Sequence, residues 1–334
     1  MARWKRLRLI ALLCPWFVVA RWWHRTILDV TAQIVDWGNN ERRLTDRVSV
    51  LAGPAPGTYP SGNSVLVRGD GESMVIDPSI LVVEFGGAPA KVDIVVNSHG
   101  HEDHMAGNGL FADAHVHIHE QDLGAAQSLD GLLNVFGFKD VETRATVGVQ
   151  FTEEMHYVAR PDANGFTDGH VFDLGGVSVT AKHLPGHTRG HSGFFIDGGV
   201  FFLSDIDLTG FGPYYGDVWS DLEQFEQSLI EVRDIEADYY VTFHQKGVIE
   251  GRETFLEMLD KFHSVIGRRH DEMLAFLAEP RTLAEMAEHR FVYRPHVDIP
   301  FVDAVEARTA DLHLKRMITR GEADEVEPGR FKAV

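Results

Sequence analysis

Short hydrophobic segments separated by glycine-rich turns follow one another from about residue 46 to residue 250. Apolar runs of this length are typical of buried strands. We therefore expect strands at Val48–Leu51, Ser64–Arg68, Met74–Ile76, Val92–Val96, Ala114–His119, Val171–Leu174, Val177–Ala181, Gly193–Ile196, Val200–Leu203 and Tyr239–Phe243. Helical patterns lie between them, around residues 104–112, 121–130 and 221–235. Two runs of strands with interspersed helices predict two sheets covered by helices, a layered α/β fold.

The pattern changes to longer helices after residue 251. Phe255–Leu277 has the spacing of a long amphipathic helix. Thr282-Leu-Ala-Glu285 has the form of a capping box and predicts the start of a second helix, and Asp303–Thr319 predicts a third. Val326–Phe331 contains a Pro-Gly pair and predicts a hairpin. This order resembles a winged-helix-like module, and a helical cap packed on the catalytic domain is an equally good interpretation.

The N-terminal segment has basic residues up to Arg8, followed by the apolar run Leu9–Ala20. This order, with Val18-Val19-Ala20 as a cleavage site, is that of a secretory signal. The run of 12 residues is too short to span a bilayer. A Trp-rich amphipathic lead-in and residues from an upstream start codon are the alternatives. The expected division of the chain is a lead-in over residues 1–45, a catalytic domain over 46–251 and a helical winged-helix-like region over 252–334.

Composition and charge narrow the class of protein. Hydrophobic residues make up 44% and charged residues 24% of the 334 residues, as in a protein that buries a full core. The net charge of −19 is uneven, because residues 1–25 carry +6, residues 26–251 carry −22 and residues 252–334 carry −3. An acidic body repels a phosphate backbone, so we expect a small-molecule substrate rather than nucleic acid.

The same features bear on location and partners. Cys14 is the only cysteine, which excludes an intramolecular disulfide and leaves the redox compartment open. We expect a cytoplasmic protein, with an N-terminal signal or membrane-associating segment as the alternative. In the second case only this N-terminal segment would contact a membrane. The oligomeric state is open, and a homodimer is compatible with the sequence.

A cluster of metal-ligand residue types, His99-Gly-His101-Glu-Asp103-His104, follows the predicted strand Val92–Val96. The imidazoles of His99 and His101 are two residues apart, so in an extended segment they point to one side and can share an ion. Asp103 and His104 begin the next turn and can serve a second ion. Imidazole and carboxylate ligands suit zinc, and also iron or manganese. The motif therefore predicts a site for two divalent metal ions.

Three more residues of ligand type follow later strands. His187 lies behind a Pro-Gly turn, Asp205 follows an apolar run, and His244 ends the last predicted strand. A carboxylate in the position of Asp205 can bridge two ions. His263 and His270, the alternatives to His244, fall on a predicted helix. Because strand ends carry functional loops, we expect these ligands to converge on one edge of the sheets.

These motifs resemble the metallo-β-lactamase superfamily over roughly residues 46–250, and the resemblance implies a four-layer αβ/βα sandwich. It implies ligand roles for seven residues: His99, His101 and His187 for the first metal, Asp103, His104 and His244 for the second, and Asp205 as the bridge. It also implies that Asp77 braces the metal loop, with a simple Asp-Pro turn as the alternative. The segment around His244 lacks the glycine that often precedes this histidine in the family.

The resemblance implies a hydrolase in which two divalent ions, most simply zinc, share a water and lower its pKa toward neutrality. Asp103 would orient this water. Class B β-lactamases carry no bridging aspartate at the position of Asp205, which argues against β-lactam hydrolysis. The context of His187 and Asp205 looks more like the glyoxalase II and lactonase branches. We therefore expect cleavage of a thioester, ester or lactone.

Aromatic residues follow the bridging aspartate and could form a substrate wall. Tyr214 or Tyr215 would hydrogen-bond a substrate carbonyl, with ordinary loop packing as the alternative. Lys246 would meet an anionic group of the substrate, or stay solvated. Two rival activities stay open: a phosphodiesterase or ribonuclease of the same fold, and a mono-iron persulfide dioxygenase-like enzyme. A non-catalytic binding protein is the third alternative, but it would not need a complete set of seven ligands.

Overall fold

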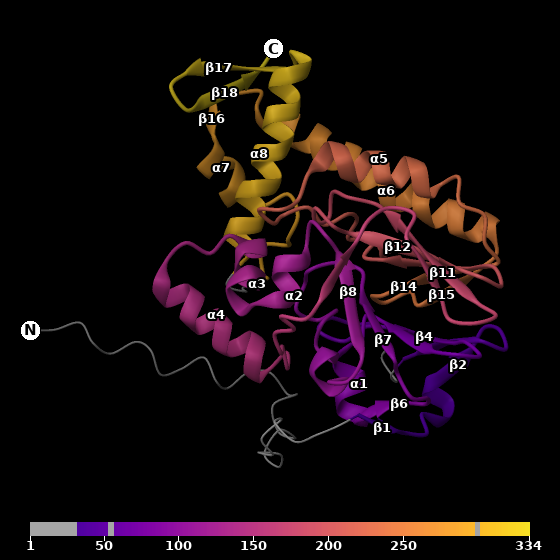
Figure 1. The fold of residues 1–334 in the computed structure, drawn as a ribbon. Coiled ribbons are helices and arrows are strands. Elements are labelled where there is room, and N and C mark those ends of the chain that lie inside the picture. The colour runs from indigo at the N-terminus through magenta and orange to yellow at the C-terminus, as the bar shows by residue number, and fades with distance from the viewer. Residues whose placement is uncertain (1–31, 53–56, 298–300) are drawn as a thin grey trace, which may run out of the picture. The chain divides into compact units, whose positions relative to one another are not determined.

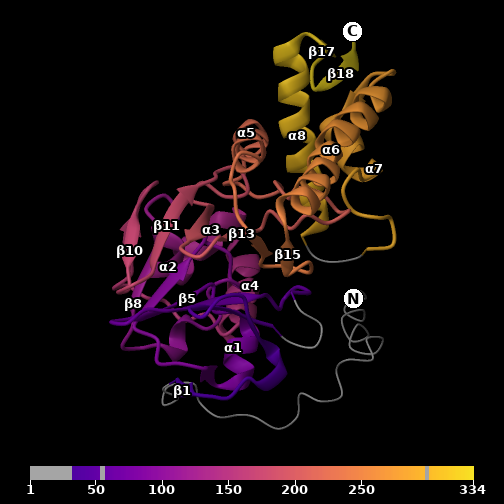
Figure 2. The ribbon, with the colours of Figure 1, turned by 90° about the vertical axis from the view of Figure 1, so that its right-hand side faces the viewer.

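The computed structural model describes residues 32–52, 57–297 and 301–334 (Figures 1 and 2). Its first large sheet has seven strands: β2 Glu41–Arg43, β3 Val48–Leu51, β4 Ser64–Arg68, β5 Ser73–Ile76, β7 Ile94–Asn97, β8 His115–His119 and β9 Asn164–Phe166. These strands lie side by side in chain order. The pairs from β2 to β5 are antiparallel, and the pairs from β5 to β9 are parallel.

The second large sheet has six strands: β10 Val171–Asp173, β11 Ser178–His183, β12 Ser192–Ile196, β13 Val200–Ser204, β14 Tyr239–Thr242 and β15 Val248–Glu250. They too lie in chain order. Only the β13–β14 pair is parallel. Both sheets are therefore mixed, as the α/β pattern of the sequence allows.

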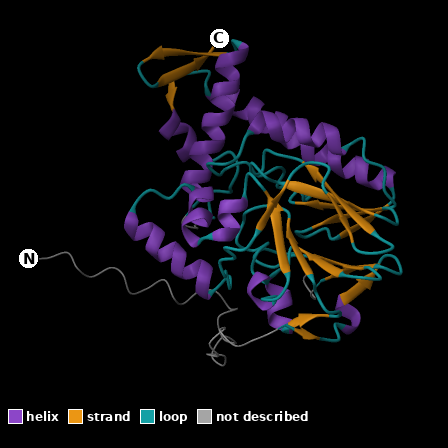
Figure 3. Cartoon of the chain, in the orientation of Figure 1, coloured by secondary structure: helices purple, strands orange, loops and turns teal. Residues whose placement is uncertain are grey.

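Helices join the strands and cover the outer face of each sheet (Figure 3). Those on the side of the first sheet are α1 Ile80–Phe85, α2 Leu123–Gln127, α3 Leu129–Phe136 and α4 Val141–Glu153. Those on the side of the second are α5 Leu222–Val232 and α6 Arg252–Phe276. A short parallel pair, β1 Gln33–Ile34 with β6 Gly87–Ala88, lies apart from the two large sheets.

Three hydrophobic cores separate the layers. One lies between the helices α1–α4 and the first sheet, one between the two sheets, and one between the second sheet and the helices α5 and α6. Strand β4 shows why its apolar run is continuous: Val65 and Val67 face the core between the sheets, whereas Leu66 faces the helices. Both faces of the central strands are buried, so the alternation of polar and apolar residues disappears.

The C-terminal region consists of helices and a small sheet. After α6 come β16 Arg281–Thr282, α7 Leu283–His289, α8 Val302–Arg320, β17 Ala323–Glu327 and β18 Arg330–Ala333. The predicted capping box is confirmed, since Thr282 Oγ1 accepts from the Glu285 backbone N–H and Glu285 accepts from that of Thr282. The predicted hairpin is formed by β17 and β18. Its classification as a winged helix stays a prediction.

Helix α6 belongs to two cores at once. Its first half contributes Phe255 and Leu259 to the core under the second sheet, and its second half contributes Met273 to a separate core with α7 and α8. The predicted domain boundary at residue 252 thus falls at the start of a helix that is shared by the two-sheet sandwich and the C-terminal region. Residues 32–334 form one compact unit.

One prediction of secondary structure is wrong, because the expected helix around residues 104–112 is only a 3-10 turn, Asn108–Leu110. The expected lead-in over residues 1–45 contains strands β1 and β2 in its last part. Strand β2 is the edge strand of the first sheet, where Glu41 accepts hydrogen bonds from Ser49 and Arg68. Charged residues on an edge strand give no apolar pattern.

The signal, anchor and start-site interpretations of residues 1–25 lie outside the described residues. Within the residues that are described, no helix is both long and apolar enough to span a bilayer.

Candidate metal centre

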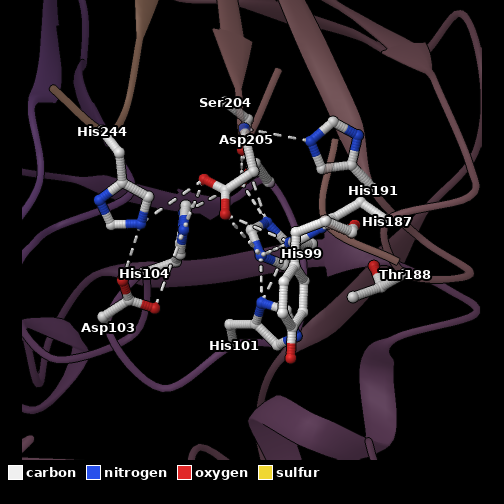
Figure 4. Close-up of polar contacts among 12 residues, drawn as sticks. His99, His101, Asp103, His104, His187, Thr188, His191, Ser204, Asp205 and His244 are labelled. Atoms are coloured by element: carbon white, nitrogen blue, oxygen red, sulfur yellow. Dashed lines mark hydrogen bonds and ion pairs between the residues drawn. The ribbon is translucent and has the colours of Figure 1, made fainter. Parts of the chain in front are cut away.

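The metal-ligand residue types of the sequence lie together where strands of the two sheets end (Figure 4). The histidine motif follows β7, and the other three residues follow β11, β13 and β14. Each of the seven side chains is buried in the protein: His99, His101, Asp103, His104, His187, Asp205 and His244. In the structure these seven side chains therefore converge at one edge of the sheets, as predicted.

Four side chains form the first cluster. The Nε2 atoms of His99 and His187 lie 3.2 Å apart, and His101 Nδ1 lies 2.9 Å from the first and 3.1 Å from the second. Asp205 Oδ2 lies 3.2 Å from His187 Nε2. Zinc–nitrogen bonds of about 2.0–2.1 Å in a tetrahedral site put ligand atoms about 3.3 Å apart. The spacing of the first cluster therefore fits an ion of this size.

Asp103, His104 and His244 form the second cluster. His244 Nε2 lies 3.1 Å from Asp103 Oδ2. The other carboxylate oxygen of the bridge candidate, Asp205 Oδ1, lies 3.1 Å from His104 Nε2 and 3.8 Å from His244 Nε2. The two oxygens of Asp205 thus face different clusters. This is the arrangement of a carboxylate shared between two ions.

Unpartnered polar atoms test whether the clusters fit metal ions. Three buried atoms, Asp103 Oδ2, His104 Nε2 and Asp205 Oδ1, have a charged neighbour at 3.1 Å but form no hydrogen bond of good geometry with the described residues. Buried polar atoms are normally paired, and leaving them without a partner is costly. All three belong to the candidate ligands of the second cluster or to the bridge. A cation between them would satisfy all three, so the residues fit a dinuclear site.

The pKa values of the ligands reflect the same convergence. Burial opposes ionisation of Asp205, but the imidazoles of His104 and His244 hold its pKa well below the ordinary value. Burial also opposes protonation of His244, yet the carboxylates of Asp205 and Asp103 raise its pKa to about 10. Without an ion, imidazolium and carboxylate neutralise one another. Ion binding would therefore release protons from these imidazoles.

Asp77 lies where the resemblance implied it would. Its carboxylate accepts from the Ser98 backbone N–H and from Ser98 Oγ, both at 2.6 Å, and from His104 Nδ1 at 2.8 Å. Asp77 is fully buried at the end of β5. A carboxylate on Nδ1 fixes the tautomer that leaves Nε2 free to bind metal. Asp77 thus braces the histidine motif and is more than an Asp-Pro turn.

The other imidazoles are also held at their outer nitrogen. His187 Nδ1 donates to Tyr214 O at 2.9 Å, and His101 Nε2 lies 2.9 Å from Asp217 Oδ2. His244 Nδ1 lies 3.1 Å from two backbone carbonyls of the segment 57–61. Such partners orient metal-binding imidazoles and raise their basicity.

Two of these positioning residues were missed by the sequence analysis. Asp217 lies in a segment noted only for its aromatic residues. Asp122 is fully buried, and its carboxylate accepts from Gly100 N, Gly190 N and Thr188 Oγ1. It therefore ties the histidine motif to the loop that carries His187. Neither aspartate follows a motif, although the position of Asp122 shortly after β8 is a strand end of the same kind as the others.

The three residues predicted to contact substrate have different positions. Tyr214 is half-buried beside His187, with a distance of 5.7 Å between the ring centres. Tyr215 is buried and its hydroxyl lies 3.0 Å from His313 Nε2 of α8, so it faces the C-terminal helices, and its substrate role stays a prediction. Lys246 is exposed, and its role stays a prediction.

The fold is an α/β sandwich, and its two buried His/Asp clusters are consistent with a dinuclear metal site. Residues 57–244 match the family described as the Metallo-beta-lactamase superfamily. The chain therefore belongs to the metallo-beta-lactamase superfamily.

Individual proteins and solved structures are also similar to this chain. An uncharacterized protein of Mycobacterium leprae is 33% identical over 119 residues, which are 35% of this chain and 48% of that protein. The chain thus matches about half the length of this relative. A metallo-beta-lactamase family protein of Thermus thermophilus has a similar structure, with a TM-score of 0.65, 20% identity and coverage of 87% of this chain and 100% of that one. A beta-lactamase domain protein of Burkholderia ambifaria has a TM-score of 0.62, 15% identity and coverage of 92% and 96%. At these identities the structures show the fold alone.

Proposed function

We propose that this protein is a dinuclear metal-dependent hydrolase that cleaves a thioester, an ester or a lactone. The observation that carries the proposal is Asp205, whose two carboxylate oxygens face the two clusters. His99, His101 and His187 would hold the first ion, and Asp103, His104 and His244 the second. Zinc suits this mixture of imidazole and carboxylate, with iron or manganese as alternatives.

Individual residues of the protein would have separate roles in the reaction. Two bound divalent ions would supply an acidified water and a polarised substrate carbonyl. Asp103 would orient the attacking water, since its buried carboxylate lies beside His244 and is held ionised by the neighbouring imidazoles, which lower its pKa against the effect of burial. Asp77 would keep the His104 ring in place while the charge of the site changes.

Tyrosine side chains gather beside the clusters, and we propose that they contact the substrate. Tyr214 lies next to His187, and the ring centre of Tyr59 is 6.3 Å from that of His244. Tyr293, which follows α7, packs on Phe211 at 5.5 Å. Burial raises the pKa of both Tyr59 and Tyr214, and nearby carboxylates and Tyr293 add to this effect. Their hydroxyls therefore stay protonated. In the structure they donate to Glu102 and Asp217, so a substrate oxygen would take the place of these carboxylates as acceptor.

The charge of the protein favours a small substrate over RNA. Residues 26–251 carry a net charge of −22, and two divalent ions would offset only four of these charges. The bridging position of Asp205 also favours acyl substrates over β-lactams, because the resemblance to lactamases of class B does not extend to this residue.

The test combines metal analysis with a panel of thioester, lactone, phosphodiester and β-lactam substrates. We expect two divalent ions per chain and turnover of a thioester, ester or lactone. Asp205→Asn should lower kcat/KM by more than about 100-fold, because even outer partners of metal ligands are worth 10- to 100-fold. Asp324→Asn, at an exposed position of β17, is the matched control and should keep full activity.

Three results would contradict the proposal. A single iron with oxygen-dependent turnover would indicate a dioxygenase, and cleavage of only the phosphodiester would indicate a nuclease. Full activity of Asp205→Asn would show that the shared carboxylate is not used.

A further inference from the structure

The segment that connects β13 to α5, residues 206–221, carries the outer partners of the first cluster. Tyr214 O accepts from His187 Nδ1, and Asp217 Oδ2 lies 2.9 Å from His101 Nε2. Ser220 Oγ donates to His187 O at 2.7 Å. The connecting segment thus sets the orientation of two of the three histidines in the first cluster.

This connecting segment contains no helix or strand. Regular backbone hydrogen bonds therefore do not fix its conformation, and contacts with other parts of the protein must do so. Part of the segment is held by the sandwich, since Asp221 N donates to Gly186 O and Asp207 Oδ1 accepts from His244 N. Residues 211–216 are held by the C-terminal helices α6 and α8.

Arg269 of α6 makes the most direct contact. Its side chain is buried, with 3% of the residue exposed, and its guanidinium donates to Pro213 O at 2.6 Å and to Phe211 O at 2.7 Å. The guanidinium also lies over the rings of Phe211 and Tyr215. No carboxylate of the described residues lies within 4.0 Å of it. A buried cation without a counter-ion is costly, so its two carbonyl contacts next to Tyr214 are the favourable interactions that hold it there.

Helix α8 supports the same segment from a second side. Tyr215 Oη lies 3.0 Å from His313 Nε2, and His313 is itself in contact with His270 of α6 at 3.3 Å. The backbone at Gly216 packs closely on α8, since a Cβ there would lie 2.4 Å from Val305 Cγ1. The two helices therefore hold the residues on both sides of Tyr214.

Among the described residues, the second cluster has no hydrogen bond from the C-terminal helices, and its one contact with the connecting segment is His244 N donating to Asp207 Oδ1 at 3.3 Å, close to the end of β13. His104 is held by Asp77, and His244 is held by the backbone carbonyls of Gly57 and Ser61. These partners all precede residue 252. His99 of the first cluster is likewise held within the sandwich, by Ser98 Oγ at 3.0 Å.

We propose that the C-terminal region supports metal binding at the first cluster and has no such effect at the second. Arg269 is a positioning residue: it fixes the connecting segment, which in turn orients His187 and His101 for the first ion. The second ion is held by the sandwich alone. The inference rests on the metal-binding part of the proposed function. It adds that the affinity for the first ion depends on the C-terminal helices, whereas the affinity for the second does not.

The experiment measures metal binding by the full chain, with Zn²⁺ and Co²⁺ titrated into metal-free protein. We expect the wild type to bind two ions. In Arg269→Gln the affinity for one ion should fall by about 10- to 100-fold, as for loss of other outer partners, while the affinity for the second ion is unchanged. The Co²⁺ spectrum of Arg269→Gln with one ion bound should match that of His187→Ala, and it should differ from that of His244→Ala.

Two further variants separate positioning from folding. Arg269→Lys keeps the charge but can reach both carbonyls less well, so it should have a smaller loss at the same cluster. Asp217→Asn leaves the C-terminal helices untouched and should weaken the same ion through His101. Arg268→Gln, an exposed neighbour on α6 that pairs only with Glu272, is the matched control and should bind both ions normally.

The outcomes are distinguishable. If the wild type binds two ions and Arg269→Gln binds both with unchanged affinity, the inference is wrong and the proposed function stands. If both ions are weakened equally in Arg269→Gln and Arg269→Lys, the residue stabilises the whole protein and the inference is again wrong. If the wild type binds fewer than two ions, the dinuclear proposal fails and the inference fails with it.

Discussion

Single buried carboxylates hold together the loops that carry the candidate metal ligands. Asp77 joins β5 to the histidine motif, and Asp122 joins that motif to the loop of His187. A carboxylate that accepts several N–H and O–H groups satisfies donors that would otherwise be buried without partners. The precision of the metal site therefore depends on residues that need not touch an ion.

The substitution Asp122→Asn tests whether a single buried carboxylate holds these loops together. The amide nitrogen of the variant cannot accept, so a donor among Gly100 N, Gly190 N and Thr188 Oγ1 loses its partner. We expect the free energy of unfolding to fall by about 1.5–3 kcal/mol, measured by urea denaturation of metal-free protein. Asp113→Asn, at an exposed position, should change it by less than about 0.5 kcal/mol. An equal effect of the two substitutions would refute the role given to Asp122.

Sequence reasoning found ligands better than their partners. The seven candidate ligands have a distinctive residue type and follow strands, so the amino-acid pattern together with the family resemblance was enough to predict them. Asp217 and Asp122 are ordinary aspartates in loops, and only the folded chain brings them to the metal loops. Tyr215 illustrates the converse. Its place in an aromatic segment predicts a substrate contact, whereas in the structure its hydroxyl lies beside His313 of α8, a contact that no sequence pattern indicates.

At the scale of elements, strands buried on both faces were the easiest to predict. The apolar runs of β3, β4 and β13 are recognisable because every hydrophobic residue in them is buried. Helix α4 was missed, since it buries only Gly148 and Phe151 and has little apolar periodicity. The charged edge strand β2 was missed for a similar reason.

Helix α8 should make the stability of the protein depend on pH through His313. The imidazole is enclosed, and the groups around it are Tyr215 of the connecting segment, His270 and Arg269 of α6, and Arg316 and Arg320 of α8 itself. Burial, with His270 and the arginines adding to it, holds the pKa of His313 well below its ordinary value of 6.5. The unfolded chain takes up a proton near pH 6.5 and the folded chain does not. The contribution of His313 to the free energy of unfolding is therefore complete above pH 6.5 and is lost as the pH falls below that value.

Metal-free wild type and His313→Gln should show this difference in urea unfolding at pH 7.5 and pH 5. We expect the wild type to lose up to about 1.4 kcal/mol more per pH unit below 6.5 than the variant. His296→Gln, at an exposed position, should follow the wild type. Parallel losses in all three proteins would mean that His313 is not the group responsible.

At the scale of the whole molecule, the C-terminal region and the sandwich are joined more closely than two linked domains would be. Helix α6 contributes to a core in each, and Arg316 of α8 pairs with Glu223 and Glu226 of α5. Elements that share a helix and buried contacts are expected to unfold together, whereas domains joined by a linker can unfold one after the other.

We therefore expect residues 32–334 to unfold in one transition. Calorimetry of the metal-free protein should give a single peak with a calorimetric enthalpy equal to the van't Hoff enthalpy. The chain has six tryptophans, of which Trp37 and Trp219 lie in the sandwich. In a variant with Phe in place of Trp4, Trp16, Trp22 and Trp23, the fluorescence therefore reports on the sandwich, while the circular dichroism of the helices includes α7 and α8. The two signals should coincide through the transition. If the helical signal fell at lower temperature than the fluorescence, the C-terminal region would be an independent cap, and its support of the first metal cluster would have to be weak.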